Sequence, residues 1–151
     1  EVIPLKNALG EHNHLRNSLL PSLMKNLKEN QHNEFPQNIF EIGRIFTLDE
    51  DEETGIKEEH YLSTLICHEK TDFTEIKQIL DVIMNSLGVE YSVKESEHNS
   101  FIKGRVGKIL IKGKELGIIG EQSPEVLTNW ELNVPVVSFE LNLEKLFELI
   151  K

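Results

Sequence analysis

Two segments of alternating apolar residues, RVGKILI at 105–111 and ELGIIGE at 115–121, are separated by only the three residues KGK. So short a connection joins antiparallel neighbours, because a parallel pair of strands needs a crossover of a dozen or more residues. The KGK segment is therefore predicted to be a tight hairpin turn. Any fold for this chain must accommodate an antiparallel sheet.

Four further segments have the composition and alternation of strands: NIFEIGRIF (38–46), HYLSTLIC (60–67), YSVKE (91–95) and PVVSFEL (135–141). Hairpins join several of the strands and helices join only some of them. This order predicts an α+β domain with a mainly antiparallel sheet of six or seven strands flanked by helices, and it disfavours a doubly wound parallel sheet. Residues 1–151 are expected to form one domain, because the length suits a single core.

The clearest helix signal follows Asp72. Asp72 is a predicted N-cap, Glu75 stands three residues later as in a capping box, and Gly88 is the expected end. Apolar residues recur between them at spacings of three and four. Two short helices are expected at SPEVLTNW (123–130) and NLEKLFELI (142–150).

Another helix is predicted in LRNSLLPSLMKNLKEN, residues 15–30, where leucines recur every four residues at 15, 19, 23 and 27. Pro21 is compatible with a helix only in the first turn, where its missing N–H would have no intrahelical partner. Ser18 is therefore the expected N-cap, and Arg16 would lie on the segment just ahead of the helix.

The composition excludes several classes of partner. The chain has 16 basic and 26 acidic residues, a formal net charge of -10, which repels nucleic acid and disfavours an independent module for binding it. No apolar run approaches the roughly 18 residues of a membrane span, so a soluble protein is expected. The single cysteine, Cys67, excludes an internal disulfide and favours an intracellular compartment. Because the chain opens with Glu1 and not methionine, we expect it to be a piece of a longer protein.

Motifs for metal binding and catalysis are weak. EHNH, residues 11–14, offers two histidines and a carboxylate, but the other histidines are scattered, and a solvated loop is favoured over a metal site. Neither Ser18 nor Ser123 lies in a nucleophile elbow. Cys67 and His68 would point to opposite faces of a strand, which favours a buried structural thiol.

The segment TLDEDEETGIKEE, residues 47–59, carries seven carboxylates and one lysine. It lies between two predicted strands and lacks the ligand spacing of a calcium loop. A solvated hairpin loop is the favoured interpretation.

Three arginines, Arg16, Arg44 and Arg105, stand out in a chain that otherwise uses lysine. A guanidinium supplies planar, multi-donor hydrogen bonding that an ammonium cannot. Glu41, Glu121 and Glu140 lie in otherwise apolar strands and are the expected partners. Structural ion pairs are favoured over direct ligand contacts.

Read in order, NALGEHNHLRNSLLPSLMKNLKEN, PQNIFEIGRIF and FIKGRVGKILIKGKELGIIGEQSPEVLTNWELNVPVVSFEL resemble the C-terminal catalytic-like module of phenylalanyl-tRNA synthetase beta subunits of the archaeal and eukaryotic type. The resemblance covers about four fifths of the chain. It implies a class II synthetase fold that does no chemistry itself and scaffolds a catalytic alpha subunit in a cytoplasmic heterotetramer of two alpha and two beta subunits.

The resemblance also implies which parts of a class II nucleotide site are missing. Such a site needs an arginine on the hairpin of its second motif and another arginine opening the helix of its third motif. Here the hairpin corresponding to the second motif carries the acidic segment 47–59, and GIIGEQSPEVL, which stands for the third motif, has no arginine. We therefore expect no catalytic residue, cofactor or metal in this chain, while the holoenzyme uses ATP and magnesium and binds tRNA through other parts.

The resemblance implies that Leu19, Leu20, Leu23 and Leu27 supply core or interface. Together with the arginines and strand glutamates named above, the expected structural or subunit-interface residues are Arg16, Leu19, Leu20, Leu23, Leu27, Glu41, Arg44, Arg105 and Glu121. Arg16 is expected to tether its segment to the sheet, and the isolated chain to self-associate through an exposed interface. The alternative is a freestanding synthetase-like paralogue that holds an amino acid or a related molecule with Glu41, Arg44 and Glu121. The length of the full reading frame would distinguish the beta-subunit module from the freestanding paralogue.

Overall fold

The computed structural model describes residues 2–6 and 13–151, and its largest element is a six-stranded sheet in which every neighbouring pair is antiparallel. The strands are β3 (Gln37–Leu48), β4 (Ile56–Cys67), β5 (Ser92–Glu95), β6 (Phe101–Ile111), β7 (Lys114–Gln122) and β8 (Val136–Asn142), in the order β3-β4-β8-β7-β6-β5. This confirms the predicted α+β class and the antiparallel sheet. A separate pair, β1 (Ile3–Pro4) and β2 (His14–Leu15), was not predicted from the sequence.

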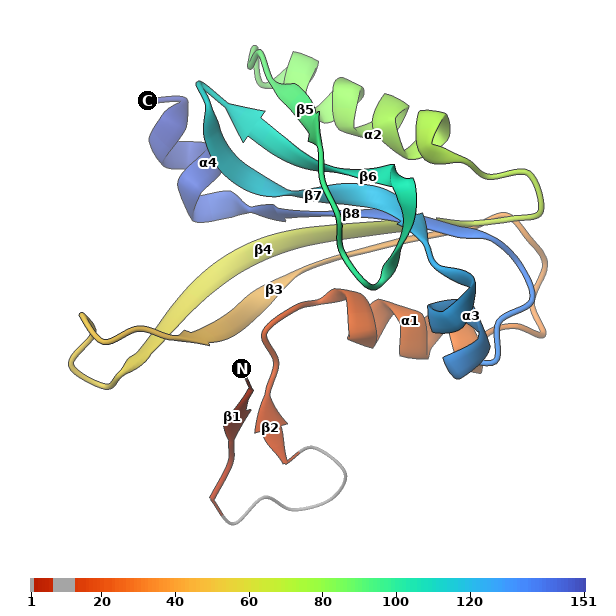
Figure 1. The fold of residues 1–151 in the computed structure, drawn as a ribbon, viewed down its shortest axis with the longest axis horizontal. Coiled ribbons are helices and arrows are strands. Elements are labelled where there is room, and N and C mark those ends of the chain that lie inside the picture. The colour runs from red at the N-terminus through yellow and green to blue at the C-terminus, as the bar shows by residue number, and fades with distance from the viewer. Residues whose placement is uncertain (1, 7–12) are drawn as a thin grey trace.

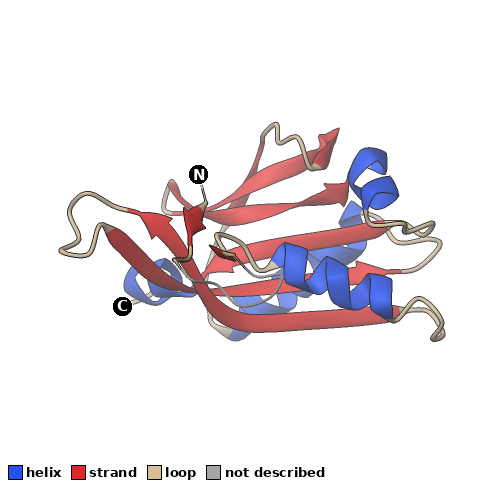
Figure 2. Ribbon diagram, turned by 90° about the horizontal axis from the view of Figure 1, so that it is seen from below, coloured by secondary structure: helices blue, strands red, loops and turns tan. Residues whose placement is uncertain are grey.

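Helices cover both faces of the sheet (Figure 1). One face carries α2 (Phe73–Ser86) and α4 (Leu143–Leu149), and the other carries α1 (Leu20–Glu29) and α3 (Pro124–Asn129). Seen from below, a helix crosses in front of the strands, with other helices behind them (Figure 2). Within the described ranges, every helix is too short or too polar to serve as a membrane span.

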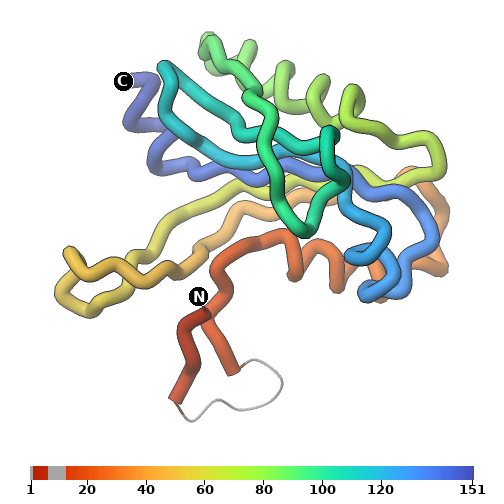
Figure 3. Tube along the Cα trace, in the orientation of Figure 1, coloured from red at the N-terminus to blue at the C-terminus, as the bar shows by residue number. Residues whose placement is uncertain are grey.

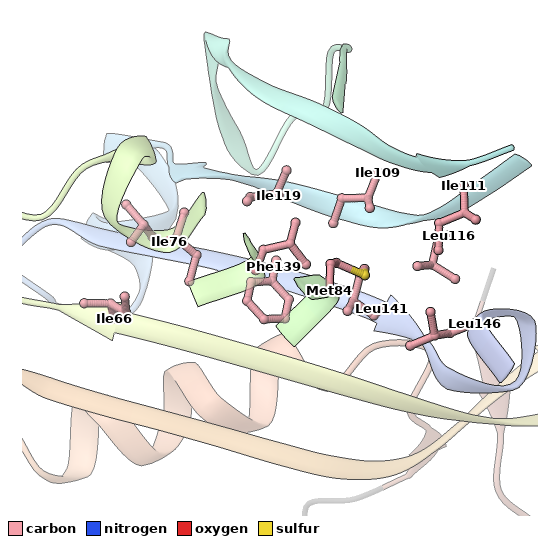
Figure 4. Close-up of a cluster of buried hydrophobic side chains, with 12 residues drawn as sticks. Ile66, Ile76, Met84, Ile109, Ile111, Leu116, Ile119, Phe139, Leu141 and Leu146 are labelled. Atoms are coloured by element: carbon pink, nitrogen blue, oxygen red, sulfur yellow. The ribbon is translucent and has the colours of Figure 1, made fainter. Parts of the chain in front are cut away.

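The main core lies between α2, α4 and the sheet (Figure 4). Phe139 of β8 is fully buried at its centre, with Ile76 and Met84 of α2 packed over it. A smaller core forms on the opposite face, where Leu23 and Leu27 of α1 pack against β4. Because helices cover both faces of β8, all seven of its residues are buried, which explains its nearly continuous apolar sequence.

The predicted turns and caps are present with one exception. Lys112 and Gly113, both with positive φ, join β6 to β7 as a two-residue hairpin turn. The side chain of Asp72 accepts a hydrogen bond from the amide of Glu75 at the start of α2. The prediction that Ser18 is the N-cap of α1 is wrong by one residue, because Leu19 occupies that position and has no side-chain cap of its own.

The hairpin formed by β3 and β4 is the longest in the sheet and reaches beyond the rest of the domain (Figure 3). Its strands pair without a register shift from Gln37↔Cys67 to Leu48↔Ile56. The tip, residues 49–55, holds five of the seven carboxylates of the acidic segment. The other two, Glu58 and Glu59, belong to β4.

Candidate functional site

Arg16 joins the chain ahead of α1 to the outer edge of β3. Its Nη1 donates a hydrogen bond to Oε1 of Glu41 at 2.6 Å, and its Nε donates to the carbonyl oxygen of Arg44 at 2.8 Å. The carbonyl oxygen of Arg16 in turn accepts from the amide of Phe46 at 2.9 Å. A lysine could not reach both acceptors in this way, because its donors share a single nitrogen.

Glu140, in the middle of β8, supplies the cap that α1 lacks. Its Oε2 accepts hydrogen bonds from the amides of Leu19 at 2.9 Å and Leu20 at 3.1 Å, and from the hydroxyl of Ser18 at 3.2 Å. A carboxylate is favourable there because the first amides of a helix carry a partial positive charge. Burial nevertheless raises the pKa of Glu140, and these hydrogen bonds offset only part of that effect.

Glu121 of β7 has the corresponding role at the start of α2. Its Oε1 accepts from the amide of Phe73 at 2.9 Å, and its Oε2 accepts from Nη1 of Arg105 at 2.8 Å. The expectation that strand glutamates pair with arginines is therefore confirmed for Glu41 and Glu121. It is wrong for Glu140, which binds the backbone of α1.

Arg44 lies on the opposite face of β3 from Glu41. Its Nη1 is 3.0 Å from Oε1 of Glu58 on β4, and both side chains are largely exposed. An exposed pair of this kind contributes at most about 1 kcal/mol. The alternative interpretation combined Glu41, Arg44 and Glu121 into one ligand site, but these side chains do not converge. Glu41 and Arg44 lie on opposite faces of β3, and the strands β4 and β8 separate β3 from β7, which carries Glu121.

The leucines named from the sequence divide into two groups. Leu19, Leu23 and Leu27 are buried in this chain. Leu20 is only half-buried and lines a pocket between α1, α3 and the sheet. The three buried leucines therefore contribute to the domain's own packing.

That pocket lies beside Glu140 and has a volume of about 470 Å³. Ser18, Phe101, Gln122, Trp130 and Glu140 are among its lining residues. None of its described lining residues is a lysine or an arginine. Glu140 already accepts three hydrogen bonds there, and Nε2 of the buried Gln122 donates to Oγ of Ser138 at 2.8 Å.

The remaining motifs do not assemble a reactive centre in the part of the chain that the structure describes. Cys67 is buried, and burial raises the pKa of its thiol to about 11, so it is a poor nucleophile. Nε2 of His68 bonds Oε2 of Glu75 at 2.6 Å and not Cys67. In the EHNH motif, Glu11 and His12 lie outside the described residues. Among the described residues, no group of three or more His, Cys, Asp or Glu side chains could hold a metal ion.

Sequence reasoning missed the helix-capping role of Glu140 and the pocket residues Gln122 and Trp130. One signal was available, since Glu140 is a lone carboxylate within the apolar run PVVSFEL. A buried carboxylate needs a cation or several hydrogen-bond donors. The sequence could not show which of these it meets.

Comparison with known proteins decides the family. A family model described as phenylalanyl tRNA synthetase beta chain CLM domain matches residues 1–143. The chain belongs to this family. The resemblance to phenylalanyl-tRNA synthetase beta subunits expected from the sequence is thereby confirmed.

Three relatives illustrate the similarity, and each bears the name phenylalanine--tRNA ligase beta subunit. The protein of Thermococcus onnurineus is 51% identical over 133 residues, which is 88% of this chain and 23% of the relative. That of Pyrococcus abyssi is 48% identical over 149 residues, 98% of this chain and 27% of the relative. That of Methanocaldococcus jannaschii is 46% identical over 140 residues, 93% of this chain and 26% of the relative. The chain thus spans about a quarter of the length of these relatives.

Proposed function

We propose that this chain is the non-catalytic, class II synthetase-like module in the C-terminal part of a phenylalanine–tRNA ligase beta subunit, and that it scaffolds the catalytic alpha subunit. The family and the names of the relatives support the subunit assignment. The holoenzyme would be a cytoplasmic heterotetramer of two alpha and two beta subunits that charges tRNA with phenylalanine, using ATP and magnesium. This module would contribute to that reaction only indirectly.

The observation that carries the proposal is that no lysine or arginine is among the described residues lining the pocket beside Glu140. A nucleotide site must neutralise several phosphate charges, which synthetases of this class do with arginines. Here the ionised form of Glu140 would face a phosphate directly, and each like-charge contact would cost on the order of 1–4 kcal/mol. The start of α1, which could attract an anion, is already occupied by Glu140.

The strand and helix pairs of the sheet support the same proposal. Two strands run directly into helices, β7 into α3 and β8 into α4, and β8 is hydrogen-bonded to β4 of the long hairpin. Neither helix contains an arginine. The hairpin tip between β3 and β4 carries only acidic charge. The proposal of an inactive module therefore has the same support whichever of these strands corresponds to the third motif.

Two measurements test the proposal. Calorimetric titration of residues 1–151 with ATP and with phenylalanine should detect no binding, and micromolar affinity for either would refute the non-catalytic assignment. Co-expression of the full-length beta subunit with the alpha subunit, followed by size-exclusion chromatography, should yield a stable complex. Deleting the region corresponding to residues 1–151 should abolish that complex, and an intact complex after the deletion would refute the scaffold role.

A further inference from the structure

The pocket between α1, α3 and the sheet has the size and lining of a small-molecule site (Figure 1). Its volume of about 470 Å³ falls within the range of about 300–1,000 Å³ that is typical of ligand pockets. Leu20, Pro21 and Met24 of α1 line one side, and Val126 and Trp130 of α3 line another. Apolar surface therefore borders the pocket on two sides.

Aromatic rings add flat apolar surface to this pocket. Phe101, at the start of β6, lies directly on the backbone of Gly120, since a Cβ atom added there would be 2.7 Å from the Phe101 ring. The Phe101 ring also meets the ring of His98 edge to face, with centroids 5.4 Å apart. Trp130 lines the same space from α3. Such rings pack well against a flat apolar ligand, and they favour one that carries a positive charge.

The polar groups of the pocket are mainly hydrogen-bond acceptors. Nε2 of Gln122 donates to Ser138, which leaves Oε1 for a ligand, and no described residue donates to that oxygen. Nδ1 of His98 accepts from the amide of Ser100 at 3.2 Å, so this nitrogen is unprotonated and the ring brings no positive charge. A ligand held here must therefore supply most of the donors itself.

Glu140 is the one acidic side chain among the described residues that line the pocket. Burial raises its pKa, although its Oε2 accepts three hydrogen bonds. A buried carboxylate is usually paired with a cation, and no described lining residue is a lysine or an arginine. A positively charged ligand would supply the counter-charge that the protein does not.

We propose that this pocket binds a small organic amine in its ammonium form, carried on an aromatic body and without a carboxylate or phosphate. The ammonium group lies beside Glu140, and the aromatic body packs against Phe101 and Trp130. Such a ligand takes no part in the charging of tRNA, so this site is additional to the proposed function.

The same lining disfavours related ligands. An amino acid or a nucleotide would bring a carboxylate or phosphates to a pocket in which no described residue is a lysine or an arginine. A neutral aromatic molecule would pack against the rings but leave Glu140 without a counter-charge. A lysine side chain of another protein has an ammonium group but no flat ring to stack on Phe101 and Trp130.

Calorimetric titration of the full-length beta subunit with three indole compounds tests the inference. Tryptamine, tryptophol and indole-3-propionate share one ring and carry an ammonium, a hydroxyl and a carboxylate respectively. Tryptamine should bind at least about tenfold more tightly than tryptophol, because hydrogen bonds to charged groups are the stronger ones. Indole-3-propionate should show no binding at about 1 mM, because its charge has the sign of Glu140. Butylamine, which has the ammonium without the ring, should bind at least about tenfold more weakly than tryptamine.

Two variants locate the binding. Glu140→Gln should reduce the preference for tryptamine over tryptophol to less than about threefold, because the counter-charge is lost. Glu121→Gln is the matched control, because Glu121 also caps a helix, accepting from the amide of Phe73 at 2.9 Å, but does not line the pocket. This variant should keep the tenfold preference. Circular dichroism shows whether each variant is folded at the temperature of the titration.

Several outcomes would overturn the inference. These are an absence of tryptamine binding, equal affinities for tryptamine and tryptophol, equal affinities for tryptamine and butylamine, and a preference for tryptamine that survives Glu140→Gln. Loss of the preference in both variants would also overturn it, since the effect would then follow from lost stability. If a variant is unfolded, the comparison of the four compounds in the wild type decides alone.

Discussion

The carboxylate of Glu140 accepts the backbone amide of Leu19 at 2.9 Å, although the two residues are 121 positions apart in the sequence. The contact joins the central strand of the sheet to the first turn of α1. Since Leu19 at the N-cap position has no side-chain cap, this carboxylate and the hydroxyl of Ser18, which accepts from the amide of Leu20 at 3.2 Å, satisfy the first amides of the helix.

Replacing Glu140 should therefore destabilise the domain in a way that depends on the replacement. Glu140→Ala leaves the amide of Leu19 without its acceptor and the amide of Leu20 with only the hydroxyl of Ser18, and it should reduce the free energy of unfolding by about 1–3 kcal/mol. Glu140→Gln keeps an acceptor oxygen of similar reach and should cost less. Urea unfolding of the three proteins measures both effects, and an equal loss in the two variants would show that capping is not the cause.

The same residue should make stability depend on pH. Burial raises the pKa of Glu140 above its ordinary value, so the folded state binds a proton at this site more readily than the unfolded state does. Its contribution is then fully present below the unfolded pKa of about 4.3 and is lost as pH rises through the folded pKa. The stability of the wild type relative to Glu140→Gln should fall as pH rises from about 4.3 towards neutral. A difference that stays constant over this range would contradict the raised pKa.

Local signals explain why most elements could be predicted from the sequence. The alternation in ELGIIGE, the KGK turn and the Asp72 cap each depend on residues within a few positions of one another, and all three are present in the structure. Propensity and periodicity are local properties, so they identify such elements without knowledge of the fold.

Contacts between distant segments could not be predicted in the same way. The hydroxyl of Ser18 does accept from the amide of Leu20, but Glu140 on the distant strand β8 accepts from both Leu19 and Leu20, and Leu19 occupies the N-cap position. Arg44 pairs with Glu58, which the sequence grouped with the acidic loop and the structure places on β4. In each case several residues have suitable chemistry. The partner that is actually met depends on how distant strands are placed and paired, which the composition of a segment does not encode.

Gly43 should control the contact between Arg16 and Glu41. A Cβ atom added at Gly43 would overlap the guanidinium of Arg16 and come within 2.9 Å of Oε1 of Glu41. Gly43→Ala should therefore displace Arg16 and cost about 1 kcal/mol, similar to Arg16→Ala, because the ion pair is partly exposed.

A double-mutant cycle of Gly43→Ala and Arg16→Ala checks this prediction. The cost of Gly43→Ala should be smaller once Arg16 is absent, because the side chain it displaces is gone. Free energies of unfolding that add to within about 0.3–0.5 kcal/mol would show that the two sites are independent. The Arg16→Ala variant should also be assayed for association of the full-length beta subunit with the alpha subunit. If both the stability and the association are unchanged, a tethering role for Arg16 is excluded.

The last prediction concerns Asp81 on α2, which joins the helix to Tyr91 just ahead of β5. The hydroxyl of Tyr91 donates to Oδ1 of Asp81, and Nζ of Lys77 lies 3.0 Å and 3.1 Å from the two carboxylate oxygens. The Tyr91 hydrogen bond, followed by that of Lys77, lowers the pKa of Asp81. A lowered pKa means that this carboxylate stabilises the fold above its unfolded pKa of about 3.9 and that the contribution is lost as pH falls through the folded pKa.

Tyr91→Phe removes the larger of these causes and should move the pKa of Asp81 back towards its ordinary value. NMR titration of the Asp81 carboxyl in the two proteins measures the shift directly. Thermal unfolding should show a smaller loss of stability in acid for Tyr91→Phe than for the wild type. In an Asp81→Asn background the same tyrosine substitution should have no effect on the acid dependence, because the titrating group is absent. An unchanged Asp81 titration in Tyr91→Phe would assign the lowered pKa to Lys77 instead.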